Sequence, residues 1–137
     1  YKYIVKGLKN IINDEFRNVY VSPLFKMRGT ECIRIAIDSS ENDETTNAYE
    51  RRIFNVTVRY YQKGDLRSEK VYAGIRRKAD KLRKHILDNQ TANTSSAKWV
   101  FLDIDSINFN IQDDENEGID DLNITEYELS VVHHNPL

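Results

Sequence analysis

The acidic segment 112–123 carries the side chains most suited to binding a cation. Its pattern DxExEG, starting at Asp113, begins like the calcium loop of an EF-hand, with glycine in the sixth place. The twelfth place of such a loop supplies a bidentate glutamate, whereas this chain has Ile124 there, and no helix pair is expected on either side. We therefore predict a solvated, acidic hairpin tip in place of a calcium site.

Three other groups of reactive side chains lack the partners that chemistry needs. His133 and His134 are neighbours on an expected strand, so their rings point to opposite faces and make a poor metal chelate. Asp103 and Asp105 share a strand face, but no nucleophile, metal ligand or histidine accompanies them in the sequence. Cys32, the only cysteine, is expected to be a small buried hydrophobe. These patterns predict a protein that is not an enzyme and that binds no metal, cofactor or small-molecule substrate.

Charge is sorted into blocks along the chain, although the totals, 20 basic and 22 acidic residues, nearly cancel. Residues 51–84 hold twelve Lys or Arg against three acids, and residues 103–137 hold ten acids and no Lys or Arg. Residues 38–50 add five acids without a base. Such segregation creates strong local fields, which bear on association more than on the fold. A molecule with opposite charges on separate surfaces can bind copies of itself head to tail, and such contacts close into a ring when the rotation permits.

These blocks supply the side chains of a predicted contact between subunits through complementary charge. The basic candidates are Arg76, Arg77, Lys81, Arg83 and Lys84. The acidic candidates are Glu41, Asp43, Glu44, Asp113, Asp114, Glu115, Glu117, Asp120 and Asp121. Exposed ion pairs contribute only about 0–1 kcal/mol each, so a specific contact must also bury apolar surface. The apolar candidates are Tyr20, Tyr61, Trp99 and Phe101.

Length and composition are those of one domain, residues 1–137, with enough apolar residues for a core. The longest apolar runs are a few residues, so no membrane span is expected, and residues 1–6 show no signal-peptide pattern. A single cysteine excludes an internal disulfide and makes a reducing cytoplasm the expected compartment.

Hydrophobic periodicity predicts the elements that must position these charges. Residues 1–13 form an amphipathic helix, because their apolar residues recur on one helical face. A short strand at 19–21 and alternating strands over 32–38 and 50–62 follow. The polar segment 39–47 is expected to be a loop at the tip of the hairpin that the two longer strands form.

The segment 68–88 has the clearest helix pattern. Ser68 suits an N-cap, and six apolar residues fall on one stripe about 100° wide. They are Val71, Tyr72, Ile75, Ala79, Leu82 and Ile86. One side of this helix is therefore expected to pack on a sheet, and the other to form a basic solvent face.

The last third of the chain reads as a polar connector over 89–98, a strand over 99–111, the acidic loop 112–123 and a final strand over 124–133. Val100, Leu102 and Ile104 alternate with one parity and Ile107, Phe109 and Ile111 with the other, which predicts a β-bulge near 103–106. The whole order predicts an α+β fold. It would be a mainly antiparallel β-sheet, made of two long hairpins and a short strand, packed by two amphipathic helices.

This layout resembles the tail terminator, or tail completion, proteins of long-tailed bacteriophages. The resemblance lies in length and element order over nearly the whole chain, including the run RRIFNVTVRYY at residues 51–61, the basic helix and the strand that starts at Trp99. It implies a homo-oligomer, a hexameric ring without catalysis that caps the tail tube, stops its growth and contacts neck or connector proteins. It also implies a place in the virion, in the tail or neck, after assembly in the host cytoplasm.

The basic helix 68–88 also permits an alternative, a non-catalytic nucleic-acid-binding module. Its cations could neutralise phosphates. Against this, its basic face has no interleaved aromatic residue, the chain has no glycine-rich phosphate loop, and the net charge is −2. The two hypotheses overlap if a ring surrounds the path of a genome and touches DNA non-specifically.

Overall fold

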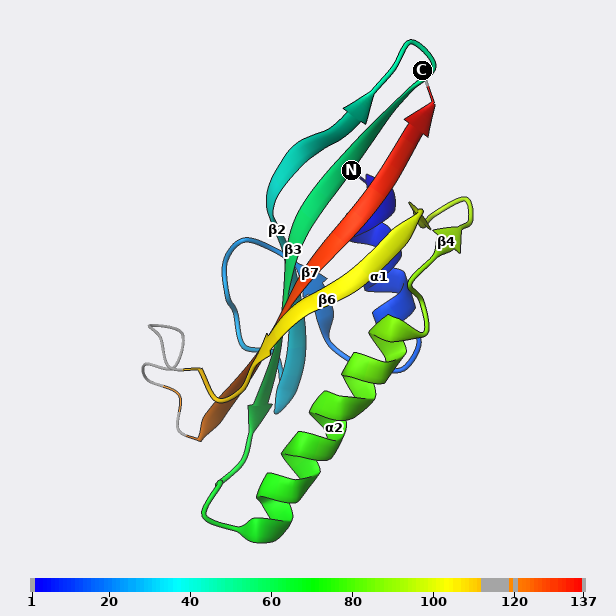
Figure 1. Cartoon of the computed structure of the whole chain (residues 1–137). Coiled ribbons are helices and arrows are strands. Elements are labelled where there is room, and N and C mark those ends of the chain that lie inside the picture. Colours follow the sequence, from blue (N-terminus) through cyan, green and yellow to red (C-terminus); the bar gives the residue numbers. More distant parts are fainter. Residues whose placement is uncertain (1, 112–118, 120, 137) are drawn as a thin grey trace.

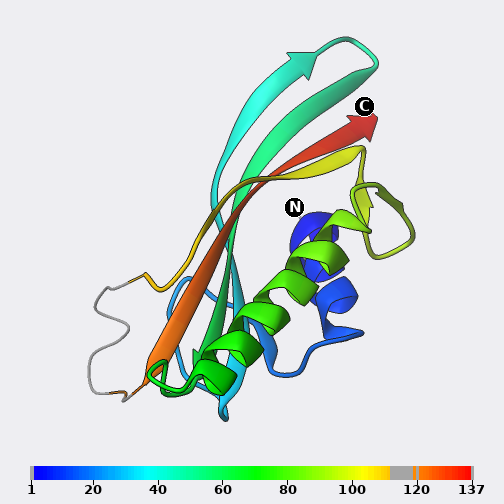
Figure 2. The ribbon, with the colours of Figure 1, turned by 60° about the horizontal axis from the view of Figure 1, so that its bottom comes forward.

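The computed structural model describes residues 2–111, 119 and 121–136, and these residues form an α+β fold built on a mixed, mainly antiparallel sheet. The elements are α1 (Lys2–Asn13), β1 (Val19–Val21), β2 (Glu31–Thr45), β3 (Tyr49–Lys63), α2 (Glu69–Leu87), β4 (Ala92–Asn93), β5 (Lys98–Trp99), β6 (Phe101–Asn108) and β7 (Leu122–Pro136). The main sheet has the strand order β1-β2-β3-β7-β6, in which β1 runs parallel to β2 and the other neighbours are antiparallel. Both helices lie on one side of this sheet (Figures 1 and 2).

The main core lies between the helices and the sheet face that they cover. Apolar alternation in the strands and helical spacing in α1 and α2 turn their apolar residues toward this layer, as the periodicity predicts. Buried members include Ile4, Leu8 and Ile12 of α1, Leu82 and Ile86 of α2, and Ile33, Val56, Val58, Tyr127, Leu129 and Val131 of the strands. The two expected amphipathic helices and both long hairpins are confirmed.

A second, smaller cluster lies on the opposite face of the sheet. Tyr20, Cys32, Tyr61, Leu122 and Ile124 are buried there, and Phe25 and Met27 of the segment between β1 and β2 pack against them. Phe25 stacks on Tyr61 with ring centroids 4.3 Å apart. Cys32 is buried, as the sequence predicts, and burial raises the pKa of its thiol. No helix of the described residues lies on this face of the sheet (Figure 2); we call it the open face.

The segment predicted as a loop over 39–47 is mostly strand. β2 continues to Thr45, and pairing with β3 runs from Glu31↔Gln62 to Thr45↔Glu50, interrupted by register shifts at Ile37/Ser39 and Asn42/Glu44. Figure 1 shows the end of this hairpin reaching beyond the helices. No described helix packs beneath it, so its residues need no apolar alternation; backbone pairing and polar side-chain contacts, such as the hydrogen bond from Arg52 to Ser40 at 2.8 Å, keep the strand. We call residues 38–52 the arm.

Three smaller predictions from the sequence have different outcomes in the structure. The predicted bulge is present as a register shift between Ile104 and Ser106. The polar connector contains the short hairpin β4–β5, and Val100 stays exposed. Val71 and Tyr72, expected in the buried stripe of α2, are also exposed, because they lie in the first turn of the helix, beyond the end of its buried face.

Candidate assembly interface

Helix α2 starts where Ser68 accepts a hydrogen bond from the amide of Val71, 3.4 Å away, and Glu69 adds a negative charge to the first turn. Ile75, Ala79, Leu82 and Ile86 bury the stripe that faces the sheet. All five basic candidates therefore lie off this stripe, at the rim or the outside of the helix. The predicted basic solvent face is present, with Arg83 half-buried at its edge.

Most of the basic side chains of α2 already have an acidic partner in the same subunit. Lys78 pairs with Glu31 at 3.0 Å and Lys81 with Glu15 at 3.5 Å. Arg83 and Lys84 share Asp80, at 2.9 and 3.6 Å, and the hydrogen bond from Arg83 holds the pKa of that carboxyl below its usual value. These exposed pairs are individually weak. They still reduce the positive charge that the helix presents to a partner.

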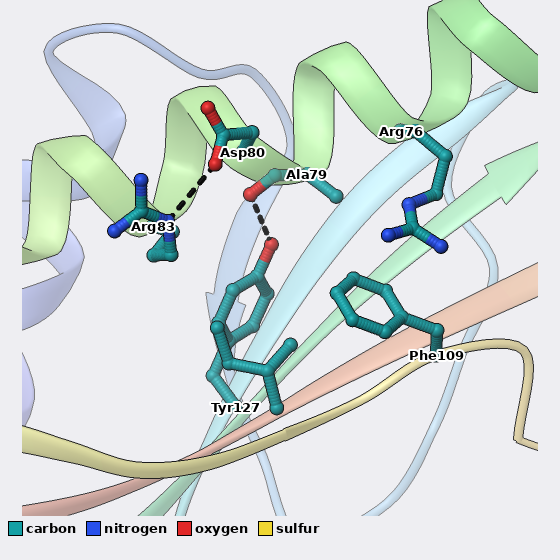
Figure 3. Close-up of a pocket in the computed structure, with 7 residues that line it drawn as sticks. Arg76, Ala79, Asp80, Arg83, Phe109 and Tyr127 are labelled. Carbon is teal, nitrogen blue, oxygen red and sulfur yellow. Dashed lines mark hydrogen bonds and ion pairs between the residues drawn. The ribbon is translucent and has the colours of Figure 1, made fainter.

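Arg76 is held differently, between aromatic rings. Its guanidinium lies 3.9 Å from the centroid of the Phe109 ring and donates to the Tyr72 hydroxyl at 3.3 Å. Figure 3 shows Arg76 over Phe109, beside a small cavity of about 60 Å³ that Tyr127 and Arg83 also line. No described carboxylate lies within ion-pair distance of Arg76. We call Tyr72, Arg76 and Phe109 the helix patch.

The acidic candidates divide between described and undescribed residues. Glu41, Asp43 and Glu44 are exposed on the arm, and Asp121 is exposed just before β7. Asp113, Asp114, Glu115, Glu117 and Asp120, with the calcium-like pattern they belong to, lie outside the described residues. The arm is less acidic than its sequence block, because pairing places Arg51 opposite Glu44 and Arg52 opposite Asn42.

Further acids lie on the open face of the sheet, away from both helices. The Asp105 carboxylate accepts from Ser130, Asp38 accepts from Thr57, and Glu128 accepts from Ser106 at 2.8 Å. Asp103 is exposed beside them and is bonded only to the amide of Ile104 among the described atoms. Near these acids, the basic Arg59 is neutralised by Glu126 at 2.7 Å. Among the described residues, Arg34, Arg51 and Arg59 share this face with Asp38, Asp103, Asp105, Glu126 and Glu128, so acids are in excess there.

An apolar row lies on this face, and two of its three residues, Ile53 and Val132, were not among the candidates from the sequence. Strand register places Phe101 beside Val132, and Val132 beside Ile53, on the same side of the sheet. Phe101 is 47% exposed, and the other two are half-buried. We call these three residues the apolar row. Their parity, opposite to that of the buried Leu102, Val131 and Phe54, is the signal that could have identified them.

Three of the four apolar candidates do not lie at the surface. Tyr20 and Tyr61 belong to the second cluster, and Trp99 packs in the main core while its indole NH donates to the Asn89 carbonyl at 2.9 Å. Their exposed fractions are 5%, 0% and 3%, so the prediction that they contact another subunit is wrong. These rings supply apolar area to the interior of the subunit, and their polar ends find partners there: Lys26 N–H for the Tyr20 hydroxyl, Arg34 for the Tyr61 hydroxyl and Asn89 for Trp99. Phe101 alone remains available.

The histidines hold structural positions. His85 contacts the Ile11 carbonyl at 2.6 Å and so joins α2 to α1, and His133 contacts the Lys98 carbonyl at 3.0 Å. Among residues 2–111, 119 and 121–136, no three His, Cys, Asp or Glu side chains gather as a metal site would require. Neither helix in that part of the chain has the length and apolar content to span a membrane.

Comparison with known proteins leaves the family open. No protein-family model matches the chain, and no curated protein matches it significantly.

Proposed function

We propose that this chain is a structural subunit that assembles head to tail into a closed ring, as the resemblance to phage tail terminators implies. The observation that carries the proposal is the separation of charge. Basic side chains gather on the outside of α2, whereas exposed acids gather on the open face and the arm, which point away from that helix (Figures 1 and 2).

Two oppositely charged surfaces at different places on the subunit favour a heterologous contact. In an isologous dimer both charged surfaces would have to belong to one self-complementary patch, whereas here they lie on opposite sides of the sheet. A head-to-tail contact instead sets the basic helix of one subunit against the acids of the next. Repetition then closes into a ring or continues as a filament. A ring of this kind at the end of a phage tail, in contact with tube and neck proteins in the virion, is the role proposed here.

The alternative, a nucleic-acid-binding module, has less support from α2. Lys78, Lys81, Arg83 and Lys84 are engaged by carboxylates of the same subunit. Phosphate binding would have to displace these carboxylates, which lowers the net gain of each contact. The aromatic rings exposed among the outward cations in the described part of the chain, Phe109 and Tyr72, are both already in contact with Arg76.

Solution mass tests the proposal. We expect light scattering after size exclusion to show a closed oligomer near six subunits at low salt, with a lower mass at high salt because exposed ion pairs are screened. Short duplex DNA should leave the mass of the protein species unchanged. A monomer that gains mass only with DNA would overturn the ring and favour the nucleic-acid module.

A further inference from the structure

We propose that the apolar row on the open face is the seat for the helix patch of a second copy of this chain. This assignment rests on the proposed ring and names the residues at the centre of its contact. It would place Ile53, Phe101 and Val132 of one subunit against Tyr72, Arg76 and Phe109 of the next.

Both surfaces leave large apolar side chains exposed to solvent in the single subunit. Phe101 is 47% exposed, Phe109 42% and Tyr72 40%, and all three are aromatic, the residue type most enriched at the centre of protein contacts. An arginine stacked on an aromatic ring is likewise typical of such centres. Ion pairs at the rim alone would contribute about 0–1 kcal/mol each, so an apolar centre is what a stable contact needs.

The charges on the Asp103 side of the apolar row are complementary to those of the helix patch, whereas Arg51 and His134 flank its other side on the same face. Asp103 is exposed next to Phe101, and Asp105 and Glu128 lie further along the same face. The helix patch carries Arg76, with the exposed Arg77 and Lys70 near it on α2. No carboxylate among the described residues pairs with Arg76, Arg77 or Lys70. The acids of the open face would supply the partners that these three cations lack.

The apolar row and the helix patch of one subunit cannot contact each other, because they lie on opposite sides of the sheet. The helix patch lies on the side of the sheet that α2 covers, where Phe109 follows the end of β6 (Figure 3). The apolar row lies on the other side of the sheet, at the beginning of β6, where Phe101 pairs with Val132. Phe101 is the first residue of β6 and Phe109 follows its last residue, Asn108, so the two surfaces lie at opposite ends of this strand, whose course Figure 1 shows. A second copy is therefore the occupant that can join the two surfaces, and the contact must be head to tail.

Two variants and their mixture test this seat. Phe101→Asp blocks the open face by placing a carboxylate in the apolar row, and Arg76→Glu blocks the helix patch by reversing its charge. We expect light scattering to find each variant monomeric when alone, at least fivefold below the mass of a six-subunit wild type. An equimolar mixture should double the mass and stop at a dimer. The mixture retains one intact pair of surfaces, while the other pair sets the two introduced carboxylates against each other.

Matched controls separate a local effect from a general one. Leu24→Asp introduces the same carboxylate at an apolar side chain that is 76% exposed and follows β1, at the sheet edge opposite to β6, and Lys9→Glu reverses an exposed charge on α1. Both should assemble like the wild type. Urea unfolding checks that all variants fold, and Phe101→Ser replaces Phe101→Asp if the latter does not.

Each outcome decides the assignment. The seat is overturned if either blocked variant still assembles, or if the mixture stays monomeric. In that case the proposed ring survives, formed through other surfaces. A wild type that is monomeric at its highest soluble concentration also overturns the seat. A wild-type monomer that gains mass with DNA overturns the proposed function itself, so the two failures are distinguishable.

Discussion

Single buried contacts join α2 to the sheet. The hydroxyl of Tyr127, whose side chain is fully buried, donates to the Ala79 carbonyl in the middle of α2 (Figure 3). We expect Tyr127→Phe to lower the free energy of unfolding by about 1 kcal/mol, because the buried carbonyl loses a partner. Urea denaturation measures this loss. Tyr72→Phe, at an exposed hydroxyl, serves as the control and should change stability by less than about 0.5 kcal/mol; equal losses would contradict the role given to the buried contact.

Glycine is required where α1 meets the β4–β5 hairpin. A Cβ at Gly7 would lie 2.7 Å from the Cβ of Ala97 and 2.9 Å from Cζ3 of Trp99. We expect Gly7→Ala to destabilise by roughly 1–3 kcal/mol, despite the better helix propensity of alanine, because the packed layer must move apart. Thermal or urea unfolding measures the change.

The matched control for this glycine is Gly74, also within a helix. A Cβ there would have only the Arg77 guanidinium nearby, at 3.8 Å. Gly74→Ala should therefore stabilise the protein by up to about 1 kcal/mol. The same sign of effect at both positions would show that packing against the β4–β5 hairpin does not decide the outcome at Gly7.

At the scale of elements, α2 depends on its first turn as well as on its buried stripe. Ser68 caps this turn by accepting from the Val71 amide. We expect Ser68→Ala to cost about 1 kcal/mol of stability, because an exposed helix end loses its side-chain acceptor. Urea unfolding tests this, with Ser96→Ala in the connector as the control. A loss no larger than that of the control would mean that water replaces the cap.

Elements that face the core were predictable, and those beyond it were not. The strands over 32–38 and 50–62 and the helices over 1–13 and 68–88 bury one face, so their apolar periodicity is visible in the sequence. The arm beyond Asp38 buries neither face, and its strand rests on backbone pairing that leaves no apolar pattern. The hairpin β4–β5 was hidden for another reason, because strands of two residues are too short to show an alternation.

For the molecule as a whole, alkaline pH should weaken the fold. Burial raises the pKa of Tyr60 and of Tyr127, with the charges of Glu31 and Asp80 as lesser causes. Above about pH 10 the unfolded chain releases phenolic protons that the folded chain retains, so each buried tyrosine lowers the unfolding free energy by about 1.4 kcal/mol per pH unit. Stability from these groups is fully present below the unfolded pKa and is lost as pH rises toward the folded one.

Urea midpoints measured from about pH 8 to pH 11 check this expectation. In Tyr127→Phe the unfolding free energy should fall less steeply with pH above pH 10. The difference is the contribution of one tyrosine, since a phenylalanine releases no proton. A flat profile in the wild type would contradict the assignment of neutral, buried phenols.

The proposed contact combines residues that the sequence identified with residues that only the structure identified. The charge blocks placed the basic residues on α2, as the structure has them, and placed acids in two loops, of which the first is mostly strand and the second lies largely outside the described residues. Tyr20, Tyr61 and Trp99 were assigned to the surface because aromatic residues suit contacts, and the structure buries them. Phe101 kept its exposed position, and its neighbours Ile53 and Val132 became visible only through strand register.

Local periodicity and residue type were enough to determine the α+β class, the two amphipathic helices, the bulge in β6 and the basic side of α2, because each depends on residues close in the chain. Tertiary structure alone decided which carboxylates neutralise the helix, which aromatic residues lie inside, and that acids from β2, β6 and β7 share the open face with an apolar row. These features join residues that are far apart in the sequence, and only the pairing of strands and the packing of helices bring such residues together.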